Sequence, residues 1–78
     1  MPTIGETLKQ AREARKLTIK QAALATRVGA HYLEAMEADD FWAMPSNVQA
    51  RGFLRLYADF LGLNTDELIA NLQAGSSL

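Results

Sequence analysis

The stretch Ser46–Leu63, SNVQARGFLRLYADFLGL, predicts a helix with more apolar surface than a single core contact requires. One row of side chains at helical spacing consists of Ala50, Leu54, Tyr57 and Leu61. A second row, rotated around the helix, consists of Gln49, Phe53, Leu56 and Phe60. Because a surface helix needs only one apolar stripe, this helix is either buried on most sides of a small bundle or presents one stripe to a partner.

The composition is that of one small globular domain. The chain has 78 residues, 49% of them hydrophobic and 22% charged, and it has no cysteine, which excludes disulfides and thiolate-bound zinc. The net charge of −1 gives no general attraction to phosphate polymers, although a local basic patch can still bind them. No apolar run reaches the roughly 20 residues that span a bilayer, so we expect a soluble, cytoplasmic chain.

Side-chain caps divide the chain into helices, and no stretch has the alternating pattern of a strand. The capping pairs are Thr3 and Glu6, Thr18 and Gln21, Ser46 and Gln49, and Asn64 and Glu67. The predicted helices span residues 4–15, 19–26, 30–38, 47–61 and 65–72. We therefore predict an all-α, compact five-helix bundle over residues 1–74. Residues 75–78 are expected to form a disordered tail or the start of a linker in a longer parent protein.

Residues 19–38 have the spacing of a helix-turn-helix. The small residue Ala23 stands where the two helices cross, and the apolar contacts of the second helix follow five, ten and thirteen residues later, at Val28, Leu33 and Met36. One position departs from the motif, because Arg27 stands where glycine is usual. A left-handed residue there costs up to about 1–2 kcal/mol, unless Gly29 takes the positive φ instead.

Two groups of residues are candidates for nucleic-acid contact. The second helix of the motif is expected to expose Ala30, His31, Glu34 and Glu37, whose carboxylates oppose a phosphate backbone. His31 either contacts a base or a phosphate or is an ordinary exposed imidazole. The exposed imidazole is the favoured interpretation. The basic residues form a local patch for phosphates or an acidic protein surface, or are simply solvated: Lys9, Arg12, Arg15, Lys16, Lys20 and Arg27.

Three segments together resemble the N-terminal cytoplasmic domain of the RodZ family, which includes YmfM. They are IGETLKQAREARKLTIKQAALATRV, HYLEAMEADDFWAMPS and ARGFLRLYADFLGLNTDEL. The resemblance covers about residues 4–72 and implies a bundle of the lambda repressor-like, Xre/Cro helix-turn-helix type, set before a membrane span in the parent protein. It also implies binding to the bacterial actin MreB, which links the cytoskeleton to the membrane and supports cell shape. The alternative function is a DNA-binding transcriptional regulator of the Xre/Cro type.

In this family, aromatic residues at the positions of Phe53 and Gln49 contact MreB, and only Phe53 keeps the aromatic here. The stripe of Phe53, Leu56 and Phe60 either contacts a partner or is covered by neighbouring helices, and Phe60 is expected to pack inward. Trp42 either anchors a partner or covers the core, with the second favoured. The candidate partner contacts are therefore Phe53, Gln49, Arg51, Leu56 and Trp42.

Three further residues of the same helix carry expectations. Gly52 weakens a helix interior by about 1 kcal/mol relative to alanine, which predicts close packing of a neighbour against it. Arg51 and Arg55 can pair with Asp59 or with an acidic partner, and an intrahelical pair between Arg55 and Asp59 is the ordinary explanation.

An enzyme is not expected. The chain has one histidine, no cysteine and no glycine-rich phosphate loop, so the nucleophile and base of most active sites are missing. His31 and Glu34 supply at most two metal ligands, fewer than a metal site needs. We predict no cofactor, no metal and no small-molecule substrate.

Overall fold

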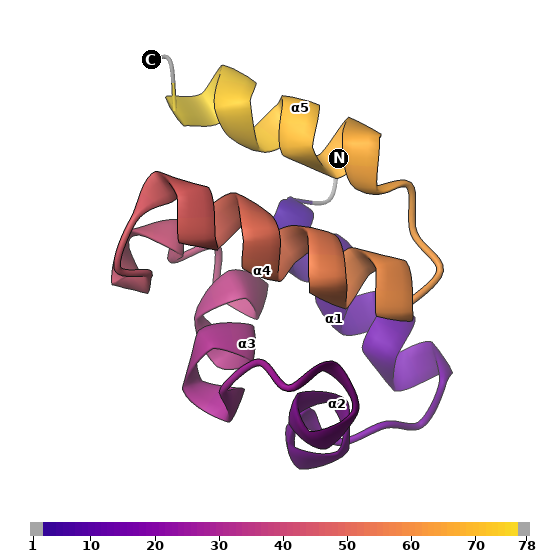
Figure 1. Ribbon diagram of the computed structural model, residues 1–78. Coiled ribbons are helices and arrows are strands. Elements are labelled where there is room, and N and C mark those ends of the chain that lie inside the picture. Colours follow the sequence, from indigo (N-terminus) through magenta and orange to yellow (C-terminus); the bar gives the residue numbers. More distant parts are fainter. Residues whose placement is uncertain (1–2, 77–78) are drawn as a thin grey trace.

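The computed structural model describes residues 3–76, with side chains through residue 72, and this part of the chain is helical without any strand. The elements are α1 (Ile4–Ala14), α2 (Ile19–Thr26), α3 (Ala30–Glu37), the short 3₁₀ helix η1 (Phe41–Ala43), α4 (Asn47–Phe60) and α5 (Thr65–Ser76). In Figure 1, α4 lies across the middle of the bundle, with α5 on one side and α1, α2 and α3 on the other. The predicted all-α five-helix bundle is confirmed.

The helices begin where the capping residues predicted. At Thr3 and at Thr18 both hydrogen bonds of a capping box are formed. The Ser46 hydroxyl accepts a hydrogen bond from the Gln49 amide, and Asn64 Oδ1 accepts one from the Glu67 amide. The main difference is that α5 extends to Ser76 rather than ending near residue 72. Residues 77–78 lie outside the described part of the chain, and the predicted domain limit at residue 74 stays a prediction.

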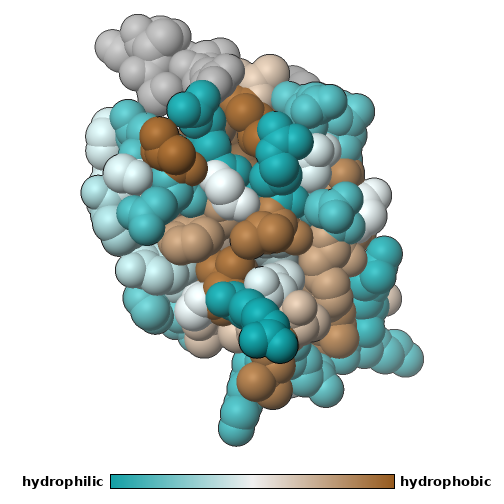
Figure 2. All heavy atoms as spheres, viewed as in Figure 1, coloured by the Kyte–Doolittle hydropathy of each residue, from teal (hydrophilic) through white to brown (hydrophobic). Residues whose placement is uncertain are grey.

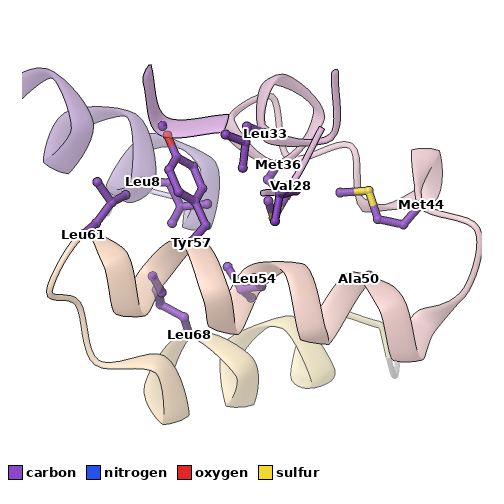
Figure 3. Close-up of a cluster of buried hydrophobic side chains, with 12 residues drawn as sticks. Leu8, Val28, Leu33, Met36, Met44, Ala50, Leu54, Tyr57, Leu61 and Leu68 are labelled. Carbon is purple, nitrogen blue, oxygen red and sulfur yellow. The ribbon is translucent and has the colours of Figure 1, made fainter. Parts of the chain in front are cut away.

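The core gathers around the buried face of α4. Figure 3 shows Tyr57 and Leu61 on the side of α4 that faces Leu8, while Leu68 points from α5 towards α4. The predicted first row of α4 is buried as expected. The buried apolar side chains are Leu8, Ala22, Val28, Leu33, Met36, Met44, Ala50, Leu54, Tyr57, Ala58, Leu61 and Leu68.

The start of α1 packs closely against the end of α3. Gly5 is buried, and its amide donates a 2.8 Å hydrogen bond to Asp39 Oδ1. A Cβ at this position would collide with the backbone carbonyl of Glu37 and lie 2.8 Å from that of Met36. Glycine is therefore required here because another backbone occupies the space of a side chain.

The turn of the helix-turn-helix places Arg27, not Gly29, in the left-handed conformation. Arg27 has φ 62° and ψ 22°, and its amide donates to the Ala23 carbonyl at 2.8 Å. Gly29 has φ −56° and ψ 139°, so the possibility that it relieves the strain is wrong. The physical reason is position: α2 has to end in a left-handed residue at Arg27, because the next residue, Val28, is buried in the core.

Arg12 and Glu37, both expected on exposed faces, are instead paired inside the bundle. Arg12 donates from Nε to Glu37 Oε2 at 2.7 Å and from Nη2 to Oε1 at 3.0 Å, and its Nη1 donates to the Leu17 carbonyl at 2.7 Å. The hydroxyl of the buried Tyr57 donates to the same Glu37 carboxylate. The expectations that Arg12 belongs to an exposed basic patch and that Glu37 faces solvent are therefore wrong, because the two groups satisfy each other.

Candidate protein-interaction surface

The outer side of α4 carries exposed apolar side chains. Val48, Gly52 and Leu56 follow one another at intervals of four residues, and all three are exposed. The exposed fraction is 69% for Val48 and 51% for Leu56. Figure 2, in the same view as Figure 1, shows the face of the molecule that α4 crosses, where hydrophobic patches lie among polar side chains. Sequence reasoning missed Val48, although its spacing from Leu56 was a usable signal.

Phe53 is half-buried, so it is neither fully covered by neighbouring helices nor fully exposed for a partner. Its side chain packs against the core cluster, and its ring centroid lies 5.0 Å from that of Tyr32 with an interplanar angle of 31°. Phe60 is also half-buried against the core, as predicted. The contact with Tyr32 holds the Phe53 ring in place, so the ring presents a fixed apolar edge at the surface.

Gln49, Phe53 and Leu56 share one side of α4, and we call this set the Phe53 flank. Gln49 precedes Phe53 by one helical turn, and Leu56 follows it by nearly one turn. Both neighbours are exposed, whereas Phe53 is partly covered. The Phe53 flank therefore combines an ordered aromatic ring with an exposed leucine and an exposed amide.

Trp42 does not cover the core, and the favoured interpretation of it is wrong. Its side chain is 84% exposed. A 3₁₀ helix has three residues per turn, so Phe41 and Met44 point to the same side, where Phe41 packs against the core and Met44 is buried. Trp42 is consequently directed outward, and it remains available as a contact for a partner.

Arg51 lies away from the Phe53 flank. Successive residues of a helix rotate by about 100°, which puts Arg51 about 200° from Phe53. It lines a shallow groove of about 360 Å³ between α4 and α5. The residues of this groove, here called the arginine groove, are Val48, Arg51, Gly52, Arg55 and Ile69.

Two expectations for the arginine groove are wrong. Apart from the two chain neighbours of Gly52 and the helix backbone around it, no atom of the described residues lies within 4 Å of a Cβ built on Gly52, so close packing of a neighbour does not explain the glycine. The pair between Arg55 and Asp59 is not formed, because the ion pair that the described residues contain within 4.0 Å is that of Arg12 and Glu37. The side chains of both groove arginines are therefore left to solvent.

The candidate nucleic-acid contacts are spread over α2, α3 and the segments on either side of α2. Lys16, Lys20 and Arg27 are exposed before, on and after α2, and Ala30 and His31 begin α3. The His31 ring lies over Tyr32, with the two centroids 4.0 Å apart. Because Arg12 and Glu37 pair with each other, Arg12 does not belong to the exposed basic patch that the sequence predicted. For the same reason, Glu37 does not belong to the exposed face of α3.

Residues 3–76 contain neither a cluster of three metal-ligating side chains nor a helix long and apolar enough to cross a membrane.

Comparison with known proteins defines the class. A family described as a helix-turn-helix domain matches residues 7–68, and this chain belongs to that family. The chain is similar to the cytoskeleton protein RodZ of Streptococcus pneumoniae (strain ATCC BAA-255 / R6), with 37% identity over 76 residues. These residues make up 97% of this chain but only 28% of that RodZ, so the chain corresponds to a small part of its relative.

Two solved structures share the fold. One is a structure described by the words "Bacterial actin MreB assembles in complex with cell shape protein RodZ". It has a TM-score of 0.89 and 28% sequence identity, and the match covers 95% of this chain and 90% of that chain. The other is YmfM from Staphylococcus aureus, with a TM-score of 0.85 and 29% identity over 94% of this chain and 89% of that one. The fold and the family resemblance inferred from sequence are confirmed.

Proposed function

We propose that this domain is the non-enzymatic, protein-interaction module of a RodZ-like cell-shape protein and that it binds an MreB-type bacterial actin. The observation that carries the proposal is the partly exposed Phe53 beside exposed Leu56 on α4. The similarity to RodZ, and to a structure described as an MreB–RodZ complex, supports the identity of the partner. In this proposal the domain lies at the cytoplasmic face of the inner membrane as part of a longer protein.

The Phe53 flank has the physical properties of an interaction hot spot. Binding energy concentrates in aromatic residues that are already ordered before the partner arrives. Phe53 meets this condition because Tyr32 and the core hold its ring, so little side-chain entropy is lost on binding. Trp42, on the turn before α4, adds a large exposed aromatic surface of the kind that interfaces favour.

Gln49 offers a direct way to strengthen the proposed interface. It is exposed one turn before Phe53, at the position where the family resemblance implies an aromatic contact. Replacing Gln49 with tyrosine adds an aromatic surface without disturbing the core, and we expect it to tighten binding by several-fold. Gln49→Ala is the matched control, because it removes the amide without adding a ring.

The decisive experiment measures the affinity of the chain for purified MreB. Trp42→Ala is the first variant, since an 84% exposed side chain can be removed without a cavity. Phe53→Ala is the second, with thermal melts to separate lost binding from lost stability. We expect each to weaken binding at least tenfold, or about 1.4 kcal/mol, whereas the exposed Leu24→Ala on α2 leaves it unchanged. Wild-type affinity in both folded variants would refute this surface.

The alternative candidate is DNA binding through the helix-turn-helix. Exposed Lys16, Lys20 and Arg27 around α2 favour it, as does the similarity to YmfM, which is described as a candidate DNA-binding membrane protein. A polarisation titration with duplex DNA at roughly 50 mM salt, where phosphate contacts are strong, tests it. Binding that Lys20→Glu weakens would support this function, and the absence of binding would exclude it.

A further inference from the structure

We propose that the arginine groove between α4 and α5 binds an acidic amphipathic segment of a protein partner, independently of the Phe53 flank. The groove combines two exposed arginines with two apolar side chains, Val48 and Ile69, and with a glycine against which no described residue packs. Its arginines lie on the other side of α4 from Phe53, about 160° around the helix, whereas Gly52 lies only about 40° from Leu56 at the edge of the Phe53 flank. The inference rests on the charge of the arginine groove and does not depend on the proposed binding of an MreB-type actin.

The two arginines supply the charge. Arg51 and Arg55 are one helical turn apart, both are exposed, and neither has a carboxylate within 4.0 Å among the described residues. Arg12 shows what this side chain does when a carboxylate is within reach, since it pairs with Glu37 through two hydrogen bonds. Arginine forks match carboxylates in this bidentate way, so two acidic side chains one turn apart complement the groove.

Gly52 supplies the space. It sits within α4 between the two arginines, and a Cβ there would meet no atom within 4 Å. Glycine in a helix interior weakens the helix, and no contact within the described chain compensates for this loss. What the glycine does provide is a stretch of bare helix surface, which permits the backbone of a partner to approach closely.

The two apolar side chains of the groove favour a protein partner over a simple polyanion. Val48 is largely exposed at one end of the groove, and the half-buried Ile69 of α5 forms its far wall. A partner segment with small apolar residues between its carboxylates contacts both. An anionic membrane is usually recognised by clusters of about four to eight basic residues, whereas the groove has Arg51 and Arg55.

A titration of the ¹⁵N-labelled chain with a synthetic peptide tests the inference. The probe is an amphipathic helical peptide with two glutamates one turn apart and alanine and leucine between them. We expect amide shifts at Val48, Gly52 and Ile69 and none at Tyr32, which packs against Phe53 from α3. A peptide with glutamine in place of each glutamate should not bind. Shifts confined to the Phe53 flank, or no shifts at about 1 mM peptide, the weakest affinity that we count as binding, would refute the inference.

Variants distinguish the groove from general electrostatics. The double variant Arg51→Gln with Arg55→Gln should weaken peptide binding at least tenfold. The control, Gln10→Glu with Ala25→Glu, changes the net charge equally at exposed positions elsewhere and should alter affinity at most twofold. Equal losses in both would contradict a specific groove. Gly52→Val should also weaken binding while the thermal melt confirms that the variant remains folded.

A titration with lipid vesicles distinguishes an acidic protein segment from an anionic membrane as the ligand of the groove. Vesicles of phosphatidylglycerol are titrated alongside the peptide. Binding to vesicles without binding to the peptide would replace the protein partner with a membrane and overturn the inference. Peptide binding that vesicles do not displace supports it. The affinity for MreB is measured separately, with Trp42→Ala and Phe53→Ala. A negative result for the MreB surface therefore does not decide the test of the arginine groove, and a negative result for the groove does not decide the test of the MreB surface.

Discussion

Arg12 of α1 and Glu37 of α3 form a nearly buried, bidentate ion pair, with 13% and 8% of their side chains exposed. Tyr57 of α4 donates its hydroxyl hydrogen bond to the same carboxylate, so three helices meet at one polar cluster. The pKa of Arg12 is raised, chiefly by its hydrogen bond to Glu37. The cluster fixes α1, α3 and α4 relative to one another, and thereby the surfaces that α4 presents.

Replacement of Glu37 by alanine should be strongly destabilising. Removing one partner of a buried ion pair leaves the other charge uncompensated, which costs about 3 kcal/mol or more. Urea denaturation measures the loss directly. Glu34→Ala is the control on the same helix, because Glu34 is exposed and should change stability by less than about 0.5 kcal/mol. Similar effects of the two variants would show that the Arg12 pair contributes little.

Tyr57 should make the stability of the fold depend on alkaline pH. Burial, and then the hydrogen bond to Glu37, raises the pKa of Tyr57 well above the ordinary 10.0. The folded state therefore favours the neutral phenol, and this contribution is fully present below pH 10. Above it, tyrosine in the unfolded chain ionises first, and stability falls by up to about 1.4 kcal/mol per pH unit.

Tyr57→Phe isolates this effect, because phenylalanine keeps the ring and cannot ionise. Denaturation curves at pH 9, 10 and 11 should show a smaller decline in the variant than in the wild type. Identical declines would mean that Tyr57 ionises equally well in the folded and unfolded chains.

Alanine should have opposite effects at two glycines. At Gly52 the side chain meets open space, so Gly52→Ala should stabilise the chain by about 0.5–1 kcal/mol through helix propensity. At Gly5 the added Cβ collides with the backbone of Glu37, and Gly5→Ala should lower stability or prevent folding. Thermal melts of both variants suffice, and a destabilised Gly52→Ala would disprove the open surface at this position.

The variant Arg27→Gly should be more stable than the wild type, because glycine relieves backbone strain at the turn before α3. Arg27 is left-handed at φ 62°, and relieving it should raise stability by about 1 kcal/mol. Arg27→Ala is the matched control, because it removes the same side chain but keeps the Cβ and its strain. A melting temperature that rises in both variants alike would point to lost charge repulsion rather than to backbone strain.

The helices and their starting points followed from interactions between residues three or four positions apart. The capping bonds of Thr3, Thr18, Ser46 and Asn64 depend on local spacing alone, as does the row of core residues on α4. Such contacts form in almost any tertiary context, so the sequence was sufficient to predict them. The helix-turn-helix was recognisable for the same reason.

The arrangement of the surface was decided by packing between distant segments. Arg12 and Glu37 are 25 positions apart, Tyr57 and Glu37 are 20 apart, and Gly5 and Asp39 are 34 apart. No local pattern encodes such pairs, because each depends on where whole helices cross. The half-burial of Phe53 against Tyr32 arises in the same way. So does the opening at Gly52, where no described residue of another helix comes within 4 Å of the position of a Cβ. The stretch from Ser46 to Leu63 thus encodes a two-striped helix, and the neighbouring helices determine which of its side chains a partner can reach.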